Sequence, residues 1–331
     1  DVCSSDLILN SQFSILNSQF SILNSQFSIV MSNLLIKIPT ELEPIVDEIS
    51  TFTELPRDEV NHRVWQEALQ LGWNVCQDAK NFGVTPHQYD SNMEALYKNG
   101  YGFIFETMVF WARPGRKHLI EITLERIQKY ASQKGKTTGD LKILLLGDGT
   151  GNDSLYLGMN GCKVEYCDFP GSKTYDFVTK RFKHYGLLDN GINLIPTYEA
   201  CLDNQYDVVI SFDVLEHLTE PWIAIANIRS MLKTEGIALI TDAYGDVTGR
   251  HPTHLESNRK FKGQSPFMFL KNGMVLTWYG SVFKPMEFTK VDKWSLRDYF
   301  ILWQDKKVIV EYLSGKSGLL KQFVKKILVK K

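Results

Sequence analysis

The sequence lacks an excess of charge of either sign. Its 331 residues include 37 lysines and arginines against 38 aspartates and glutamates, a formal net charge of −1. Because nucleic acids are bound largely through a positive field, this balance argues against a nucleic-acid partner. The sequence also has no apolar run as long as a membrane span, and no charged N-terminal segment followed by an apolar one. We therefore expect a cytoplasmic protein.

Cysteine is scarce as well. The five cysteines are scattered through the chain, and no two of them have the spacing of a zinc site or of a CxxC redox motif. A disulfide-stapled secreted domain is therefore not indicated, and we expect reduced thiols that pack as ordinary side chains. The length, with a hydrophobic content of 44%, allows one large domain or two smaller ones.

The first thirty residues differ in pattern from the rest. A seven-residue unit occurs three times without error, as Leu9–Ile15, Leu16–Ile22 and Leu23–Ile29. Its serine, asparagine and glutamine are weak helix formers, which argues against a coiled coil. The unit resembles a translated tandem DNA repeat of cyanobacterial type. We therefore predict that residues 1–30 are a non-native leader and that the natural protein starts at Met31; the alternative is a genuine low-complexity tail.

Residues 31–138 are predicted to form a helical cap. From residue 41 to about residue 133, apolar side chains recur at helical spacing, for example at Val60, Val64 and Ala68. A dense aromatic stretch runs from Tyr101 to Trp111. Its side chains either pack in the core or form a lid or wall of a substrate pocket.

Residues 139–313 alternate between strand-like and helix-like segments. Continuous apolar runs are typical of strands buried on both faces, and their alternation with helices predicts a parallel sheet covered on both sides. The fold class is therefore α/β, a doubly wound sheet with an N-terminal helical cap. The expected strands are 143–146, 162–167, 192–195, 206–212 and 237–241, with strand-like pieces at 275–279 and 308–312, and the expected helices include one that ends at Asn160, 173–185 and 221–232.

A glycine-rich turn follows the first of these strands. Gly147, Gly149 and Gly151 allow a tight turn and let a ligand approach the backbone closely. The spacing is GxGxG, whereas a dinucleotide site calls for a third glycine at the position of Asn152. The turn therefore favours a nucleoside ligand without a pyrophosphate.

Two further segments end in polar residues at the same expected edge of the sheet. Asp168 ends the second strand, where a carboxylate can accept hydrogen bonds from both ribose hydroxyls, and Phe169 beside it suits an adenine ring. Asp213 begins the segment Asp-Val-Leu-Glu-His-Leu after the fourth strand. Polar residues at this point meet a ligand in open α/β sheets.

These segments, in this order, resemble the class I S-adenosylmethionine-dependent methyltransferase family, in particular its small-molecule branch with a "DVLEHL" signature, over roughly residues 141–242. The resemblance implies a seven-stranded sheet whose last strand is antiparallel, S-adenosylmethionine as the cofactor, and a small-molecule acceptor. The family often has an acidic residue where this chain has Leu145, and we expect Asp148 to contact the ammonium group of the cofactor instead. The implied cofactor-binding residues are Gly147, Asp148, Gly149, Gly151, Asp168, Phe169 and Asp213.

Methyl transfer to a hydroxyl group also needs a base, and three histidines are candidates. His217 lies in the DVLEHL segment, while His251 and His254 follow the fifth strand, where this fold lines the acceptor pocket. We predict that His254 and His217 are the catalytic residues. A divalent ion would also be suited by the side chains of Asp213, Glu216, His217 and His254. Many relatives have the same residue types at these positions without a bound metal, so we predict none.

The last residues, 314–331, form a basic amphipathic tail. An apolar stripe from Leu319 to Leu328 is flanked by five lysines, as in helices that lie on membranes. The alternative is a helix docked on its own domain. With the tail in contact with a membrane, we predict a methyltransferase that O-methylates a sugar or a lipid-linked glycan intermediate. The alternatives are a catalytically inactive cofactor-binding regulator and an NAD-dependent dehydrogenase.

Overall fold

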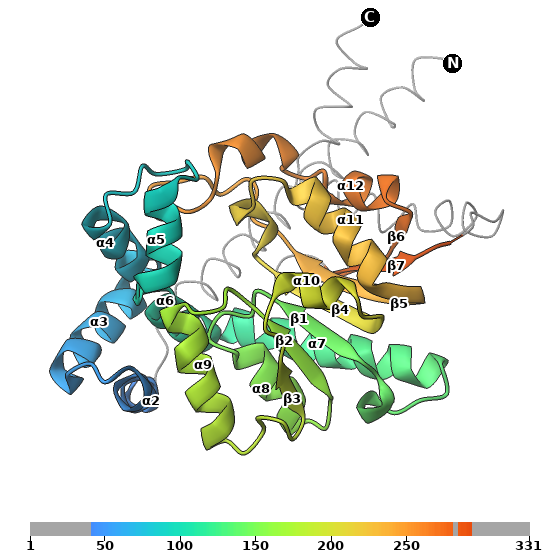
Figure 1. The fold of residues 1–331 in the computed structure, drawn as a ribbon, viewed down its shortest axis with the longest axis horizontal. Helices are drawn as coiled ribbons and strands as arrows, with labels where there is room; N and C mark the ends of the chain where they lie inside the picture. Colours follow the sequence, from blue (N-terminus) through green and yellow to red (C-terminus); the bar gives the residue numbers. More distant parts are fainter. Residues whose placement is uncertain (1–40, 281–283, 293–331) are drawn as a thin grey trace, which may run out of the picture.

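The computed structural model describes residues 41–280 and 284–292 (Figure 1). The predicted leader at 1–30, the strand-like piece at 308–312 and the basic tail at 314–331 lie outside the described residues. Among the described helices, none combines the length and apolarity that crossing a bilayer requires.

A seven-stranded sheet forms the centre of the protein, with the order β3-β2-β1-β4-β5-β7-β6 (Figure 1). Strands β1 to β5 pair in parallel, and β7 is antiparallel to its neighbours β5 and β6. The predicted doubly wound, mostly parallel sheet is therefore confirmed. The strands are β1 (Ile143–Leu146), β2 (Val164–Cys167), β3 (Ile192–Leu194), β4 (Tyr206–Phe212), β5 (Leu232–Thr241), β6 (Met274–Tyr279) and β7 (Met286–Lys290).

Helices cover both faces of this sheet because its central strands are apolar on both sides. Along β1, Ile143 and Leu145 pack with one set of helices, and Leu144 and Leu146 pack with the other. Successive side chains of a strand point to opposite faces, so an unbroken apolar run needs cover on both. The first set is α7 (Pro114–Gln133), α8 (Asn152–Met159) and α9 (Lys173–His184), and the second is α10 (Tyr198–Leu202), α11 (Pro221–Met231) and α12 (Ser265–Lys271).

The N-terminal helices form a separate layer beside the carboxyl edge of the sheet (Figure 1). Their apolar core includes Val46, Val60 and Phe105, and it extends to Phe177 of α9, which joins the layer to the α/β part. Helix α7 falls in the range predicted as cap, but its apolar side packs on the sheet. The layer consists of α2 (Glu43–Thr53), α3 (Arg57–Leu69), α4 (Trp73–Asn81), α5 (Ser91–Asn99) and α6 (Gly102–Trp111).

Two strands differ from their expected bounds. Strand β5 begins at Leu232, before the expected start at residue 237, because Leu232 pairs with Tyr206 across an irregularity in the register. Strand β7 lies between the two strand-like pieces expected at 275–279 and 308–312, where no strand was predicted from the sequence. Two of its charged side chains are buried, Glu287 in an ion pair with Arg126 of α7 at 2.8 Å and Lys290 in a hydrogen bond to the carbonyl of Leu232.

Candidate active site

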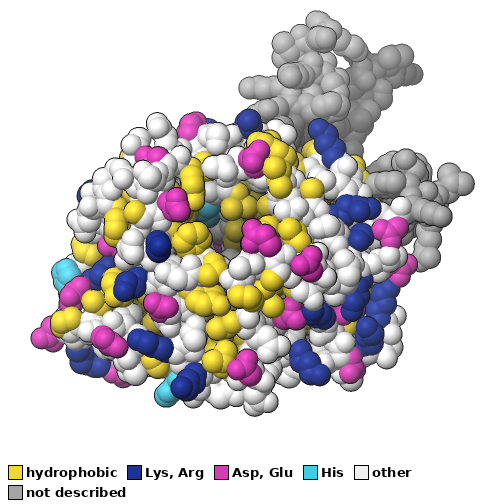
Figure 2. Space-filling view, in the orientation of Figure 1, with side chains coloured by type: hydrophobic (Ala, Val, Ile, Leu, Met, Phe, Trp, Pro, Cys, Tyr) yellow, Lys and Arg dark blue, Asp and Glu magenta, His cyan; other side chains and the backbone are white. Residues whose placement is uncertain are grey.

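A cavity of about 1010 Å³ lies at the carboxyl ends of β1, β2, β4 and β5, under the N-terminal helices. Figure 2 shows a hollow in this face of the molecule that is bordered by hydrophobic side chains. Its wall includes the strand ends Leu146, Cys167 and Phe212 and, from α6, Phe103 and Trp111. The aromatic stretch singled out in the sequence thus contributes to the cavity, which lies at the edge where α/β sheets commonly bind ligands.

Two of the three glycines in the turn after β1 line this cavity. Gly147 and Gly149 have φ values of +74° and +57°, a left-handed conformation that residues with a side chain rarely adopt. A side chain on Gly147 would come within 2.5 Å of Val214, the residue after Asp213. A side chain on Gly149 would meet only Thr107 at 3.4 Å, so the space over this backbone stays open toward the cavity.

Gly151 has a different place from the other two glycines. It lies at the start of α8 and is not among the cavity-lining residues. A β-carbon there would collide with Val178 and Phe182 of α9. The absence of a side chain at Gly151 lets α8 and α9 pack closely. The sequence had assigned this glycine to the cofactor, but the structure places it outside the cavity lining.

Replacing Gly151 by valine is expected to lower the free energy of unfolding by about 2–5 kcal/mol. Overpacking typically costs roughly 1–3 kcal/mol, and a left-handed backbone at a residue with a side chain adds about 1–2 kcal/mol. Urea denaturation of the variant and the wild type would measure the loss. A variant with unchanged stability would mean that α9 is not packed against the turn.

Asp168 lies at the cavity, at the end of β2, and its position is fixed by the turn. One carboxylate oxygen accepts a hydrogen bond from the amide of Gly149 at 2.8 Å, and the other accepts one from the amide of Phe169 at 2.6 Å. Burial raises the pKa of this carboxyl group above its usual value. Each oxygen retains a further lone pair for a ligand hydroxyl, and Phe169 remains partly exposed at the cavity wall.

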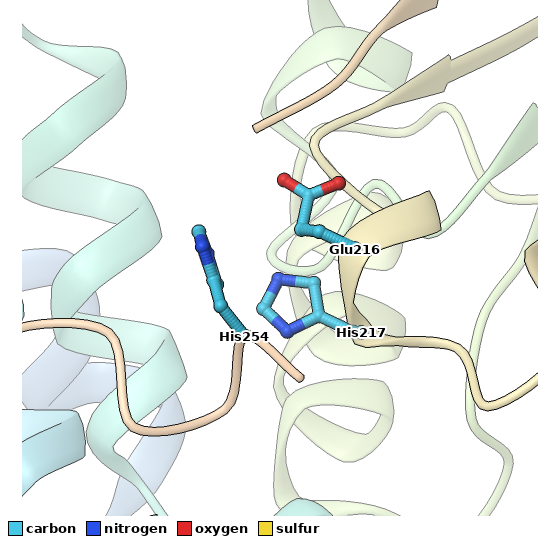
Figure 3. A group of neighbouring side chains, drawn as sticks. All are labelled: Glu216, His217 and His254. Atoms are coloured by element: carbon cyan, nitrogen blue, oxygen red, sulfur yellow. The ribbon is translucent and has the colours of Figure 1, made fainter. Parts of the chain in front are cut away.

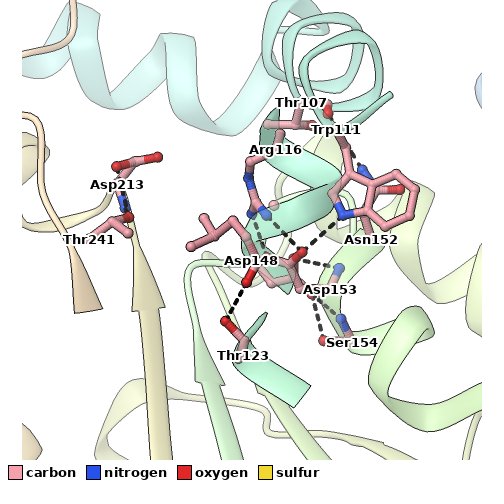
Figure 4. A network of polar contacts seen from close by, with 12 residues as sticks. Thr107, Trp111, Arg116, Thr123, Asp148, Asn152, Asp153, Ser154, Asp213 and Thr241 are labelled. Atoms are coloured by element: carbon pink, nitrogen blue, oxygen red, sulfur yellow. Dashed lines mark hydrogen bonds and ion pairs between the residues drawn. The ribbon is translucent and has the colours of Figure 1, made fainter. Parts of the chain in front are cut away.

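Asp148 caps helix α8 as well as lining the cavity. Its carboxylate accepts hydrogen bonds from the amide and hydroxyl of Ser154, at 2.8 and 2.6 Å, and from the amide of Asp153 (Figure 4). Burial, with the neighbouring charge of Asp153, raises its pKa to about 8. Donors at the N-terminus of α8 therefore already occupy both oxygens of the carboxylate that the sequence assigns to the cofactor's ammonium group.

Arg116 was missed by the sequence-based prediction. It extends from α7 into the cavity wall, where it forms an ion pair with Asp153 at 2.5 Å, and the indole of Trp111 donates to the same carboxylate (Figure 4). Thr107 of α6 bonds to Thr150 in the glycine turn at 2.9 Å. The contacts of Trp111 and Thr107 join the helical layer to α8 and to the turn, and no local sequence signal marks them.

Asp213 follows β4 in a left-handed conformation, with φ of +54°, and lines the cavity. Its carboxylate accepts a hydrogen bond from the hydroxyl of Thr241 at 2.8 Å, at the end of the adjacent strand β5 (Figure 4). This contact and the amide of Asp213, which donates to the same hydroxyl, hold the backbone in the unusual conformation. Asp213 therefore lines the same cavity as Gly147, Gly149 and Asp168.

His217 and His254 lie side by side in the cavity wall, their ring centroids 4.7 Å apart. Burial lowers the pKa of His217 to about 3 and that of His254 to about 4, so both rings are neutral at pH 7. His251 stacks on His254 at 4.8 Å and lies 3.3 Å from the carboxylate of Asp246. The structure thus brings together all three histidines that the sequence proposed.

The helical layer also positions these histidines. The hydroxyl of Tyr97 on α5 lies 3.0 Å from His217 Nδ1, and His87 Nδ1 lies 2.9 Å from the carbonyl oxygen of His254. The amide of His87 donates to the carbonyl of Pro252 at 2.7 Å. The loop after β5 is therefore anchored to residues more than 150 positions earlier in the chain.

A comparison with known families matches residues 115–291, more than half of the chain, to a profile described as "Methyltransferase domain". The chain belongs to the methyltransferase family. This match agrees with the class I resemblance seen in the sequence and supports S-adenosylmethionine as the cofactor.

Solved structures similar to this methyltransferase share little sequence with it. The cyclase SpnF is 16% identical over 46% of this chain and 57% of its own (TM-score 0.34). Phosphoethanolamine N-methyltransferase 2 of Haemonchus contortus is 16% identical over 46% of this chain and 37% of its own, with a TM-score of 0.35. Magnesium protoporphyrin IX methyltransferase of Synechocystis, solved with S-adenosylmethionine, is 18% identical over 54% of this chain and 84% of its own, with a TM-score of 0.38. The chain thus spans about half or less of the first two proteins. No curated protein sequence matches it.

The cavity of this methyltransferase fits its cofactor at two points. The open backbone over Gly149 is a cradle that a β-carbon would fill, and the fixed carboxylate of Asp168 can accept ribose hydroxyls. The carboxylate of Asp213 lines the same cavity and would suit the positively charged end of the cofactor.

Replacing Gly149 by valine is expected to abolish cofactor binding while the protein still folds. A branched side chain would stand in the cradle and would be strained at a φ of +57°, but it would meet no core residue. Calorimetric titration with S-adenosylhomocysteine would measure the loss. Normal affinity in a folded variant would show that the turn has only a structural role.

Proposed function

We propose that this methyltransferase transfers the methyl group of S-adenosylmethionine to a hydroxyl oxygen of a small molecule, a sugar or a lipid-linked glycan intermediate. The observation that supports the proposal is the pair of neighbouring imidazoles in the wall of the cavity, His217, which is half-buried, and His254, which is buried. An amine acceptor in its free-base form needs no such groups, whereas a hydroxyl acceptor must lose its proton.

The bound cofactor supplies a methyl group that is already activated by the positive sulfur. We infer that Asp168, Gly149 and Asp213 hold the cofactor, so that the reacting carbon faces the histidine side of the cavity. The bond between the methyl carbon and sulfur breaks as the bond to the acceptor oxygen forms, and the electron pair stays on sulfur. The acceptor's proton must leave, which is the step that His217 and His254 assist. Alignment in such a site contributes roughly 7–11 kcal/mol.

The acceptor side of the cavity combines flat apolar surfaces with hydrogen-bonding groups. Tyr89 and Phe110 line it, as do Glu106, Asp246 and Arg250. A sugar ring has apolar faces and polar edges, which suits this composition. The lipid-linked form of the acceptor is supported by the basic amphipathic tail alone, which lies outside the described residues.

The experiment is an assay of acceptor chemistry with the full-length enzyme. Labelled S-adenosylmethionine is incubated with a panel of hydroxylated sugars and with amino analogues matched in size, and products are identified by NMR. We expect methyl ethers and one equivalent of S-adenosylhomocysteine. Methylation confined to the amino analogues would overturn the oxygen as the acceptor atom.

A further inference from the structure

Two imidazoles and one carboxylate converge in the cavity wall, from two separate segments of the chain (Figure 3). Glu216 and His217 belong to the short helix η2 (Leu215–His217) after β4, and His254 belongs to the loop after β5. Each side chain offers one ligand atom, and the three atoms lie within 4.8 Å of one another. All three residues line the cavity.

The hydrogen bonds of the two histidines leave lone pairs for a ligand. His217 Nδ1 lies 3.2 Å from the carbonyl oxygen of Thr253. The tautomer in which Nδ1 donates to this carbonyl has its lone pair on Nε2, where it can bind a ligand. A histidine that binds a metal commonly donates its other ring N–H to such a group. His254 is 7% exposed, and its buried Nδ1 has no hydrogen-bond partner within the part of the chain that the structure describes.

The backbone around the group is well anchored. The amide of Leu255, next to His254, donates to the carbonyl of Glu216 at 3.1 Å, so the two segments are bonded directly to each other. The bond of Asn258 to the same carbonyl, at 3.0 Å, strengthens this junction. Bonds from a metal to histidine and glutamate are roughly 2.0–2.2 Å long, so only a small closure of the three side chains is needed.

We propose that Glu216, His217 and His254 bind a divalent cation of the zinc class, which in turn coordinates the oxygen of the methyl acceptor. This inference rests on the proposed function, and it replaces the expectation from sequence that the protein uses no metal. Two imidazoles with one carboxylate favour a transition-metal ion over magnesium or calcium. Asp213, the fourth residue considered from sequence, is not part of the group, because its carboxylate bonds to Thr241.

The cation would act on the acceptor's proton. Held by Glu216, His217 and His254, a zinc-class ion would lower the pKa of the acceptor hydroxyl, and the proton would pass to water. Methyl transfer to this oxygen would give the methyl ether, S-adenosylhomocysteine and one proton. No oxidation state changes, which suits a redox-inert ion.

Metal binding can be tested without any acceptor. Full-length protein, freed of metal with a chelator, is titrated with Co²⁺ alone and followed by its visible absorption, and then with Zn²⁺ by calorimetry. We expect one ion per chain. Loss of an outer-shell partner lowers metal affinity roughly 10–100-fold, so loss of a ligand in His217→Ala, His254→Ala or Glu216→Gln should lower it at least 100-fold. His118→Ala, which removes an exposed imidazole on α7, should leave the titration unchanged.

The same preparations separate this proposal from the proposed function. If the ion binds as expected and its removal abolishes methylation of a hydroxyl acceptor, with recovery on adding Zn²⁺, both are supported. If Co²⁺ and Zn²⁺ do not bind, or if the three variants bind them normally, the metal site is overturned, whatever the acceptor. If the ion binds but only amines are methylated, the metal site stands and the oxygen acceptor is overturned.

Discussion

Replacing His254 with alanine lowers the turnover number at least 100-fold and leaves the affinity for S-adenosylmethionine nearly unchanged. The imidazole lines the cavity in contact with His217, on the side that the proposed function assigns to the acceptor. Groups that assist proton removal typically contribute 10²–10⁴-fold. Steady-state kinetics with a hydroxyl acceptor and calorimetry with S-adenosylhomocysteine measure the two effects separately.

The matched control for this prediction is His251→Ala. This residue lies on the same loop and stacks on the His254 ring, but it is outside the group with Glu216. Its replacement is expected to reduce turnover less. Small and equal losses in the two variants would contradict the role of His254 and leave His217 as the residue that assists proton removal.

Replacing Asp168 with alanine weakens binding of S-adenosylmethionine by about 1.5–3 kcal/mol, which is roughly 10–150-fold in Kd. The expected cause is the loss of charge-assisted hydrogen bonds to the ribose. The variant also loses the two acceptors that hold the amides of Gly149 and Phe169, so the turn becomes less ordered. Calorimetric titration of the folded variant, with its Tm as a check on the fold, gives the measurement.

Two controls separate the charge of Asp168 from its shape. Asp168→Asn retains the size and one acceptor oxygen, and should bind with intermediate affinity. Asp246→Ala removes a carboxylate from the acceptor side of the cavity and should leave cofactor affinity near the wild-type value. Wild-type affinity in Asp168→Ala would rule out the ribose as the partner of this carboxylate.

Elements whose signals are local were predicted well from the sequence. Strand β1 has the expected bounds because its four apolar residues need cover on both faces, and α9 begins where Ser172 caps its first turn. Strand β7 could not be predicted in this way. Its Glu287 is compatible with a buried strand only because Arg126, 161 positions earlier, supplies the partner charge.

The residues of the candidate site differ in the same way: some have a local sequence signal, and others are placed only by long-range contacts. Asp168 and Phe169 lie where the sequence placed them, because each directly follows a strand whose end is easy to recognise. Arg116 lies 37 positions before Asp153 in an ordinary polar helix start, so nothing in its neighbourhood indicated a place in the cavity wall. Gly151 belongs to a clear motif, but only the structure shows that its missing side chain leaves room for Val178 and Phe182 of α9.

By itself the sequence determined the class of fold, the family and the cofactor, because apolar runs, glycine turns and strand-end carboxylates depend on residues close together in the chain. The tertiary structure alone decided which groups face one another across the cavity. Glu216 and His217 meet His254 only because β4 and β5 are neighbours and the helical layer anchors the loop after β5. Such contacts depend on packing between segments far apart in the chain, which no local pattern records.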